Sequence, residues 1–237
     1  MLKTISTAAL AASAFALAAP AALALTADAN VTSISASWRN AVPSTVDIDN
    51  SGATKTARWG SAATSDGRSG YDFTAAATPF TAQVDDQFDL GVFVHQNFPI
   101  TETNPASIPG TIDLLVEIEG NLTDPDSTAF AVQSVFSFEH IETPNDGDPC
   151  AEGGGQPCGD RVNAVLNLGE STSVEVGDMS YFFAISGFEV DGNLFTSFFT
   201  DEGAANDAAL KGSFTADVNV VPLPAAGWLL IAGAGAL

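Results

Sequence analysis

Two cysteines are the most reactive side chains of this sequence, and their spacing favours a disulfide. Cys150 and Cys158 are the only cysteines, with seven residues between them in a loop rich in glycine, proline and aspartate. Exchange motifs place two residues between their cysteines, so this spacing does not predict a redox-active pair. In an exported chain the pair is expected to be oxidised. Closing so short a loop stabilises a fold by roughly 2 to 3 kcal/mol.

The same loop is acidic and offers ligands for a hard cation. Ca²⁺ takes 6 to 8 oxygen ligands, which carboxylates and backbone carbonyls supply. The carboxylates predicted to bind it are Asp146, Asp148, Glu152 and Asp160. The segment from Asn145 to Asp148 is similar to a calcium turn but lacks the full EF-hand spacing. The alternative, favoured by the acidity of the whole chain, is a solvated acidic turn.

The two histidines, His95 and His140, each lie near the end of a predicted strand. A zinc site needs a third ligand, which the sequence alone does not locate, and the thiols are expected to bond each other. We therefore expect His95 and Asn97 to lock a strand end or turn by hydrogen bonding. The alternative is a surface site where His95, Asn97 and a nearby tryptophan stack on sugar rings. Trp38 and Trp59 could equally belong to the core.

Catalytic signatures are absent from the sequence. It contains no Gly-x-Ser-x-Gly elbow, phosphate-binding loop, dinucleotide fingerprint or His-Glu-x-x-His motif. Paired carboxylates are abundant, so glycoside hydrolysis stays open as an alternative. We predict a protein that is not an enzyme and that needs no cofactor, calcium apart.

Charge and composition favour an acidic, β-rich protein. The formal net charge is -22, from 29 acidic and 7 basic residues, so the chain repels phosphate backbones and nucleic acid is not an expected partner. The residues suit strands and turns, with 16 Phe and 21 Gly among 237 residues. That length fits one domain once the apolar ends are set aside.

The middle of the chain consists of short apolar runs separated by Gly, Pro, Asn and Asp. Ile112, Leu114, Val116 and Ile118 alternate with mostly polar residues, as in a half-buried strand. The predicted strands are 31–38, 56–59, 88–95, 111–119, 129–140, 161–166, 172–176, 179–188 and 209–217. One short helix is predicted near 202–210. The expected fold is all-β, an antiparallel, jelly-roll-like β-sandwich formed by residues 25–220.

The first residues have the pattern of a signal peptide. Lys3 precedes an apolar, alanine-rich run, and Ala22-Leu23-Ala24 places small residues at a cleavage site. We predict that residues 1–24 are removed, with 27–29 as the alternative site. A retained membrane helix is disfavoured because Pro20 interrupts the run.

The last residues form a second apolar segment. Val221, Pro222, Leu223, Pro224 and Ala225 lead into an uncharged run. This segment resembles the VPLPA form of the sorting signals related to PEP-CTERM. The resemblance implies a membrane-held precursor and processing by an exosortase-type protease, in bacteria that make extracellular polysaccharide. The family's basic cluster is missing, and 13 apolar residues from Ala225 are too few to span a bilayer. We therefore expect 221–237 to be a truncated signal with the start of a membrane helix. The alternative is a sorting signal that has decayed.

The body resembles the THxN family of PEP-CTERM proteins, also grouped with choice-of-anchor domains. The resemblance rests on residues 90–100, with Val94 in place of the family's threonine before His95 and Asn97, and on Trp38, 57–60, 67–73 and 138–145. It implies an exported fold without an assigned activity. We expect a non-enzymatic surface or matrix protein that associates with exopolysaccharide and contacts the membrane through its C-terminal segment. The alternative is a carbohydrate-binding module or weak glycosidase.

Overall fold

The computed structural model describes residues 27–101, 108–166 and 172–218, and these residues form a β-sandwich. The predicted all-β antiparallel sandwich is confirmed. Within the described ranges there is no helix with the length and apolar character needed to cross a membrane.

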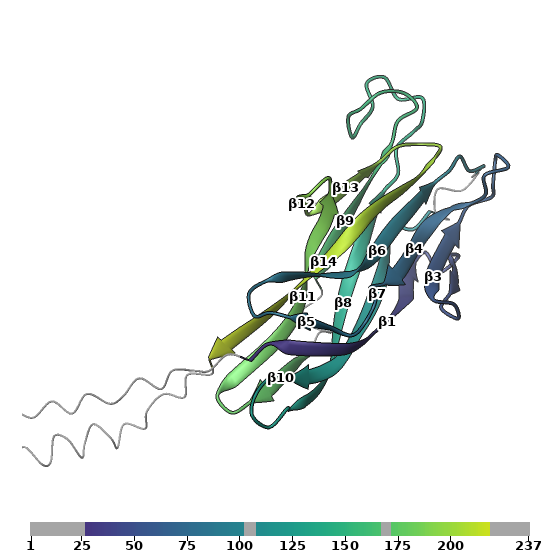
Figure 1. Ribbon diagram of the computed structural model, residues 1–237. Coiled ribbons are helices and arrows are strands. Elements are labelled where there is room, and N and C mark those ends of the chain that lie inside the picture. Colours follow the sequence, from purple (N-terminus) through teal and green to yellow (C-terminus); the bar gives the residue numbers. More distant parts are fainter. Residues whose placement is uncertain (1–26, 102–107, 167–171, 219–237) are drawn as a thin grey trace, which may run out of the picture.

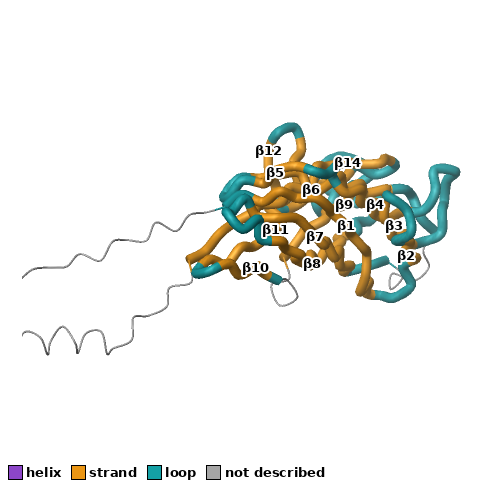
Figure 2. Tube along the Cα trace, turned by 60° about the horizontal axis from the view of Figure 1, so that its bottom comes forward, coloured by secondary structure: helices purple, strands orange, loops and turns teal. Residues whose placement is uncertain are grey.

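Two antiparallel sheets make up the sandwich (Figures 1 and 2). The first sheet has six strands in the order β13, β9, β8, β7, β1, β5, which are Ser197–Thr200, Asp160–Leu166, Ala129–Ile141, Thr111–Leu122, Ala29–Val42 and Phe80–Ala82. The second has the order β10, β11, β14, β6, β4, β3, β2, which are Ser173–Val176, Met179–Val190, Ala204–Val218, Gln87–Asn97, Ser69–Ala75, Thr54–Trp59 and Asp47–Asp49. Strand β12 (Asn193–Phe195) pairs with β11.

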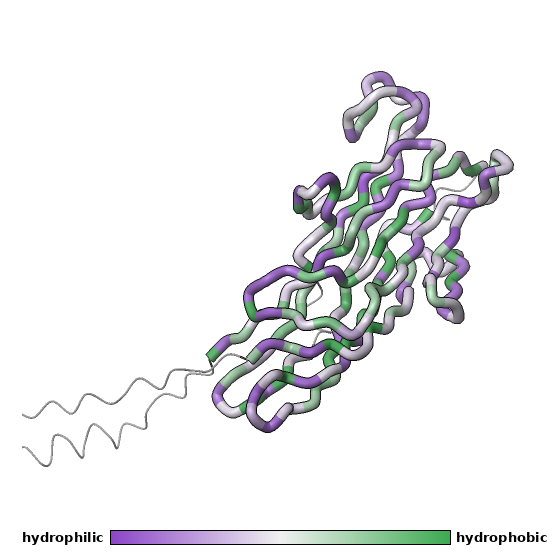
Figure 3. Tube along the Cα trace, in the orientation of Figure 1, coloured by the Kyte–Doolittle hydropathy of each residue, from purple (hydrophilic) through white to green (hydrophobic). Residues whose placement is uncertain are grey.

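Alternation of apolar and polar residues decides which face of each strand is buried. In β7 the side chains of Ile112, Leu114, Val116 and Ile118 are all buried, as the pattern predicts. Figure 3 shows the same alternation of hydrophobic and hydrophilic residues along several neighbouring strands. Each of the nine predicted strands has a counterpart among the observed strands. The additional strands that sequence reasoning missed are β2, β4, β5, β12 and β13.

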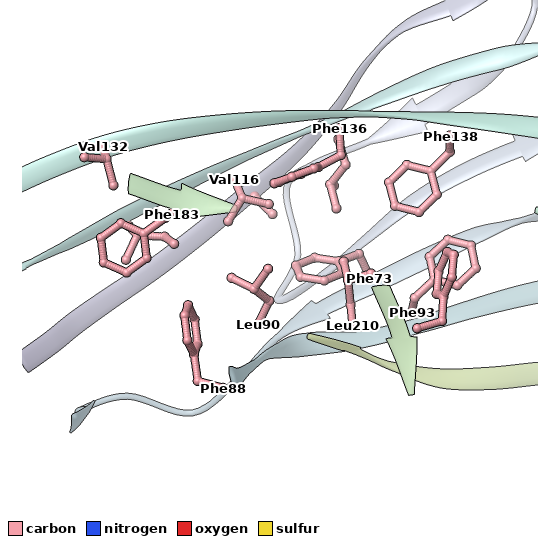
Figure 4. Close-up of a cluster of buried hydrophobic side chains, with 14 of the residues drawn as sticks. Phe73, Phe88, Leu90, Phe93, Val116, Val132, Phe136, Phe138, Phe183 and Leu210 are labelled. Carbon is pink, nitrogen blue, oxygen red and sulfur yellow. The ribbon is translucent and has the colours of Figure 1, made fainter. Parts of the chain in front are cut away.

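Aromatic side chains fill the space between the sheets. Phe93 of β6 and Phe138 of β8 stack across the sandwich, with ring centroids 5.2 Å apart (Figure 4). Phe88 contacts Phe183 edge to face at 6.0 Å, further along the core. Large buried aromatic side chains of this kind contribute strongly to the apolar burial that holds two sheets together.

The helix predicted near 202–210 is wrong, because residues 204–218 form β14. Alanine-rich segments favour a helix, but pairing on both sides overrides that weak preference. Ala204 pairs with Asn97 of β6, and Ala209 pairs with both β6 and β11. The buried Ala208 and Leu210 then point into the core at strand spacing.

The first and last described residues lie at the same end of the sandwich. The backbone N–H of Ala27 donates to the Tyr181 hydroxyl (3.3 Å), and Tyr181 pairs with Ala216 near the end of β14. The loop between β8 and β9 projects from the opposite end, at the top of Figure 1. We call these the terminal end and the loop end.

Candidate functional site

Polar side chains replace the apolar core at the loop end of the sandwich. Phe93 and His95 point inward two residues apart on β6, and Phe138 and His140 do the same on β8. Because the two phenylalanines stack, the histidines beyond them also meet, with ring centroids 5.1 Å apart and planes at 87°. Strand alternation therefore brings one histidine from each sheet to a shared buried position.

Asp160 joins them from the first position of β9, beside β8. Gly159 allows the chain to approach β13 closely at this point, since a Cβ there would overlap the Thr200 carbonyl oxygen. Glu142, just after β8, completes the group that we call the histidine cluster: His95, His140, Glu142 and Asp160.

The potential ligand atoms of this cluster are close together. One atom from each of His95, His140 and Asp160 lies within 4.8 Å of the other two. His140 Nε2 lies 2.9 Å from Glu142 Oε2 and 3.9 Å from Asp160 Oδ2. His95 and Asp160 are 0% and 1% exposed, so water reaches neither freely.

Hydrogen bonds to Thr200 orient the His95 ring. The Thr200 hydroxyl donates to the Asp160 backbone carbonyl (3.3 Å), so its oxygen accepts from His95 Nδ1, 2.9 Å away. Asn97 Nδ2 also donates to that oxygen (3.4 Å). In this arrangement the proton of a neutral His95 is on Nδ1, which leaves the Nε2 lone pair available to the cluster.

Aromatic rings hold His140 in a matching orientation. Its Nδ1 is 2.7 Å from the hydroxyl of the buried Tyr71, a β4 residue opposite His95 in the ladder. The Trp59 ring packs edge-on against His140, at 5.1 Å between centroids, and also against Tyr71 at 4.8 Å. Both imidazoles are thus fixed through Nδ1, with Nε2 of His140 directed at carboxylates.

Two buried polar atoms of the cluster lack partners. No described group hydrogen-bonds to His95 Nε2 or to Asp160 Oδ2. The other Asp160 oxygen, Oδ1, accepts from the Thr143 backbone N–H at 2.9 Å. An unsatisfied buried polar group costs about 1 to 3 kcal/mol, so the unliganded cluster is energetically unfavourable.

Burial shifts the protonation of these groups. It lowers the pKa of His95 well below the usual value, with His140 adding to the effect. Burial and the neighbouring Glu142 raise the pKa of Asp160 to about 8. Burial, again with Glu142, raises the pKa of Glu202 to about 7. In the cluster, therefore, a neutral His95 imidazole lies beside an Asp160 carboxyl group that resists ionisation.

Two surface hollows flank the cluster. One has His140 and Glu142 in its lining, with residues 143–145 beside them. The other has a volume of about 230 Å³ and lies between the glycines at 153–155 and Phe199, with Asp160 and Thr200 in its lining. The cluster is therefore buried but lies close to solvent.

The predicted calcium ligands are not brought together. Glu152 forms an ion pair with Arg161 (2.7 Å), Asp160 points into the histidine cluster, and Asp146 and Asp148 are exposed. Within the described ranges, His95, His140 and Asp160 are the one set of three or more metal-capable side chains close enough to share an ion.

The cysteine prediction is confirmed, since Cys150 and Cys158 form a disulfide with Cα atoms 5.4 Å apart. The proposed sugar-stacking surface at His95, Asn97, Trp38 and Trp59 is wrong, because all four side chains are buried by the packing of the two sheets. The other expectation, that His95 and Asn97 hydrogen-bond at a strand end, agrees with the structure, because both contact Thr200, the last residue of β13. The predicted signal peptide 1–24 and the sorting motif 221–225 lie outside the described residues.

Sequence reasoning missed how the cluster is assembled. Asp160 was assigned to the acidic loop and not to the histidines, and Tyr71 and Thr200 were not singled out. The signal that could have found the pair of histidines is the repeated Phe-x-His spacing, which places each histidine on the core face of its strand.

A scan against protein-family models found no match for this chain, and a search of curated proteins found no match either.

Proposed function

We propose that this chain is a non-enzymatic protein of a bacterial cell surface or extracellular matrix. In this proposal residues 1–24 direct export and 221–237 hold the precursor at the membrane for an exosortase-type protease. The sandwich between them then associates with exopolysaccharide. We also propose that the chain is a member of the THxN and PEP-CTERM proteins that its motifs resemble.

The disulfide between Cys150 and Cys158 is the observation that carries the proposal. Disulfides persist in oxidising compartments and are rare in the cytosol of most organisms. Both cysteines are buried, so the bond pins a glycine-rich loop that has few apolar contacts of its own. The formal charge of -22 favours an acidic matrix component over a nucleic-acid or anionic-lipid binder.

The placement of the two ends of the described body supports display at a surface. Val218 ends β14 at the terminal end, where the predicted anchor would follow. The fifteen residues of β14, at about 3.3 Å each, then extend about 50 Å from that point toward the loop end.

The oxidation state of the cysteines tests this function in cells. The full chain and a variant lacking residues 2–24 are expressed, and free thiols are trapped with a polymer-linked maleimide that slows migration on a gel. We expect the full chain to be unmodified and outside the cytoplasm, and the leaderless variant to be modified on two thiols. Cytoplasmic full-length protein with free thiols would overturn the proposal.

A further inference from the structure

We propose that the histidine cluster binds one divalent transition-metal ion of the zinc class through His95 Nε2, His140 Nε2 and the carboxylates of Asp160 and Glu142. The ion would join the two sheets at the loop end, because His95 belongs to the second sheet and the other ligands belong to or adjoin the first. This inference does not depend on export or on the proposed matrix function.

The donor set selects the class of metal. Two imidazole nitrogens with carboxylate oxygens suit zinc and its first-row neighbours, and structural zinc is almost always tetrahedral. Calcium and magnesium prefer oxygen ligands throughout, so two histidines at the centre disfavour them. Ligand atoms around a tetrahedral zinc lie about 3.3 Å apart. The present separations of up to 4.8 Å therefore require a modest closure of the cluster.

The surrounding hydrogen bonds match those of a metal site. Metal-bound histidines usually donate their second ring N–H to a fixed oxygen, which orients the ring. In the metal-bound form His95 Nδ1 would donate to the Thr200 hydroxyl in this way, and His140 Nδ1 faces the Tyr71 hydroxyl. Both Nε2 atoms are thus left on the side of the carboxylates.

The cluster also needs a cation. His95 Nε2 and Asp160 Oδ2 are buried without partners, and both would be satisfied by one ion between them. In the part of the chain that the structure describes, no lysine or arginine pairs with Asp160 or Glu142, since the nearby Arg161 pairs with Glu152. A metal ion supplies the missing charge and both missing contacts at once.

The test uses the full chain, produced under oxidising conditions, stripped with a chelator and then titrated with Zn²⁺. We expect one Zn²⁺ per chain, a higher unfolding midpoint, and no comparable response to Ca²⁺ or Mg²⁺. Co²⁺ in place of Zn²⁺ should give the visible absorption of a tetrahedral nitrogen and oxygen site. No Zn²⁺ uptake, or an equal response to Ca²⁺, would overturn the proposal.

Asp160→Asn and His95→Gln assign the binding to these residues. Each should weaken Zn²⁺ binding by at least roughly 100-fold. Loss of a residue that only orients a metal ligand weakens binding by at most about that factor. The matched control is Asp146→Asn, which removes an exposed carboxylate of the same acidic loop and should bind Zn²⁺ like the unaltered chain. Full Zn²⁺ affinity in a folded Asp160→Asn protein would refute the assignment. Should His95→Gln not fold, the stripped and reloaded unaltered chain still decides whether zinc binds.

Discussion

The acidic loop and the histidine cluster share Asp160 but differ in how their polar groups are satisfied. In the loop, Glu152 pairs with Arg161, while Asp146 and Asp148 are exposed. In the cluster, His95 Nε2 and Asp160 Oδ2 are buried without partners. Density of carboxylates in the sequence pointed to the first region. Unsatisfied buried atoms point to the second, and they are the stronger sign of a ligand because leaving them unpaired costs free energy.

The largest expected difference between the two regions concerns Trp59, whose ring packs against the cluster. Trp59→Ala should lower the free energy of unfolding by about 3 to 5 kcal/mol, since it empties a fully buried site against Tyr71 and His140. Phe199→Ala is the matched change beside the loop, where the ring is 58% exposed, and it should cost less than about 0.5 kcal/mol. Urea unfolding measures both, and equal costs would contradict the comparison.

Removal of the disulfide comes next in size. Cys150→Ala with Cys158→Ala should cost about 2.5 kcal/mol, because the bond closes a loop with a sequence separation of 8. Zn²⁺ uptake by the cluster should persist in this variant, because its ligands lie on or beside strands held by sheet pairing. Loss of zinc binding in the variant without the disulfide would show that the structure of the cluster depends on the loop.

Tyr71→Phe removes only the hydroxyl that faces His140 Nδ1. We expect a loss of about 1 to 3 kcal/mol in stability, the usual range for a buried group left unpaired. Zn²⁺ binding should weaken by roughly 10- to 100-fold, as when other supporting partners of metal-bound histidines are removed. Calorimetric titration separates the two effects. A stability loss without any change in affinity would reduce Tyr71 to a packing residue.

Glu202 borders both regions, because Asn145 of the loop donates to it (2.9 Å) and Glu142 of the cluster raises its pKa. The pKa of Glu202 is about 7 in the folded chain and 4.5 normally, so folding favours its protonated form. The stability that goes with this protonated form is fully present below pH 4.5 and is lost as the pH rises through 7. Glu202→Gln should therefore match the unaltered metal-free chain at pH 4 and exceed it above pH 7. The gain should be about 1 kcal/mol after allowance for solvent screening. A difference that does not change with pH would contradict this.

The smallest effect is expected in the loop carboxylates. Asp148→Asn should change the unfolding midpoint by less than the equivalent of about 0.5 kcal/mol, with or without millimolar Ca²⁺. Thermal unfolding checks this directly. A calcium-dependent rise that Asp148→Asn abolishes would restore the acidic loop as the ion site and reverse the comparison.

The sequence predicts the sandwich well because alternation is a local property. Ile112 to Ile118 alternate in a single strand, and the burial of one face follows without knowledge of the rest of the chain. The strand at 204–218 was missed in part, because its alanines favour a helix locally and only pairing with β6 and β11 makes it a strand.

The cluster was not predictable from the sequence in the same way. Phe93-x-His95 and Phe138-x-His140 indicate that each histidine points inward, but they do not say that β6 and β8 face each other across the core. Asp160 reaches His140 through the pairing of β9 with β8. Which strands are neighbours is decided by packing of the whole domain, which local patterns do not contain.

The position of β14 has a mechanical consequence. It lies between β11 and β6, with antiparallel ladders on both sides, and Val218 is its last residue. A pull on a C-terminal tether would load both ladders along their length, so that many hydrogen bonds share the force. An edge strand under the same pull would have one ladder instead of two to share the force. The sandwich would therefore resist being drawn apart under flow at the end by which we propose it is held.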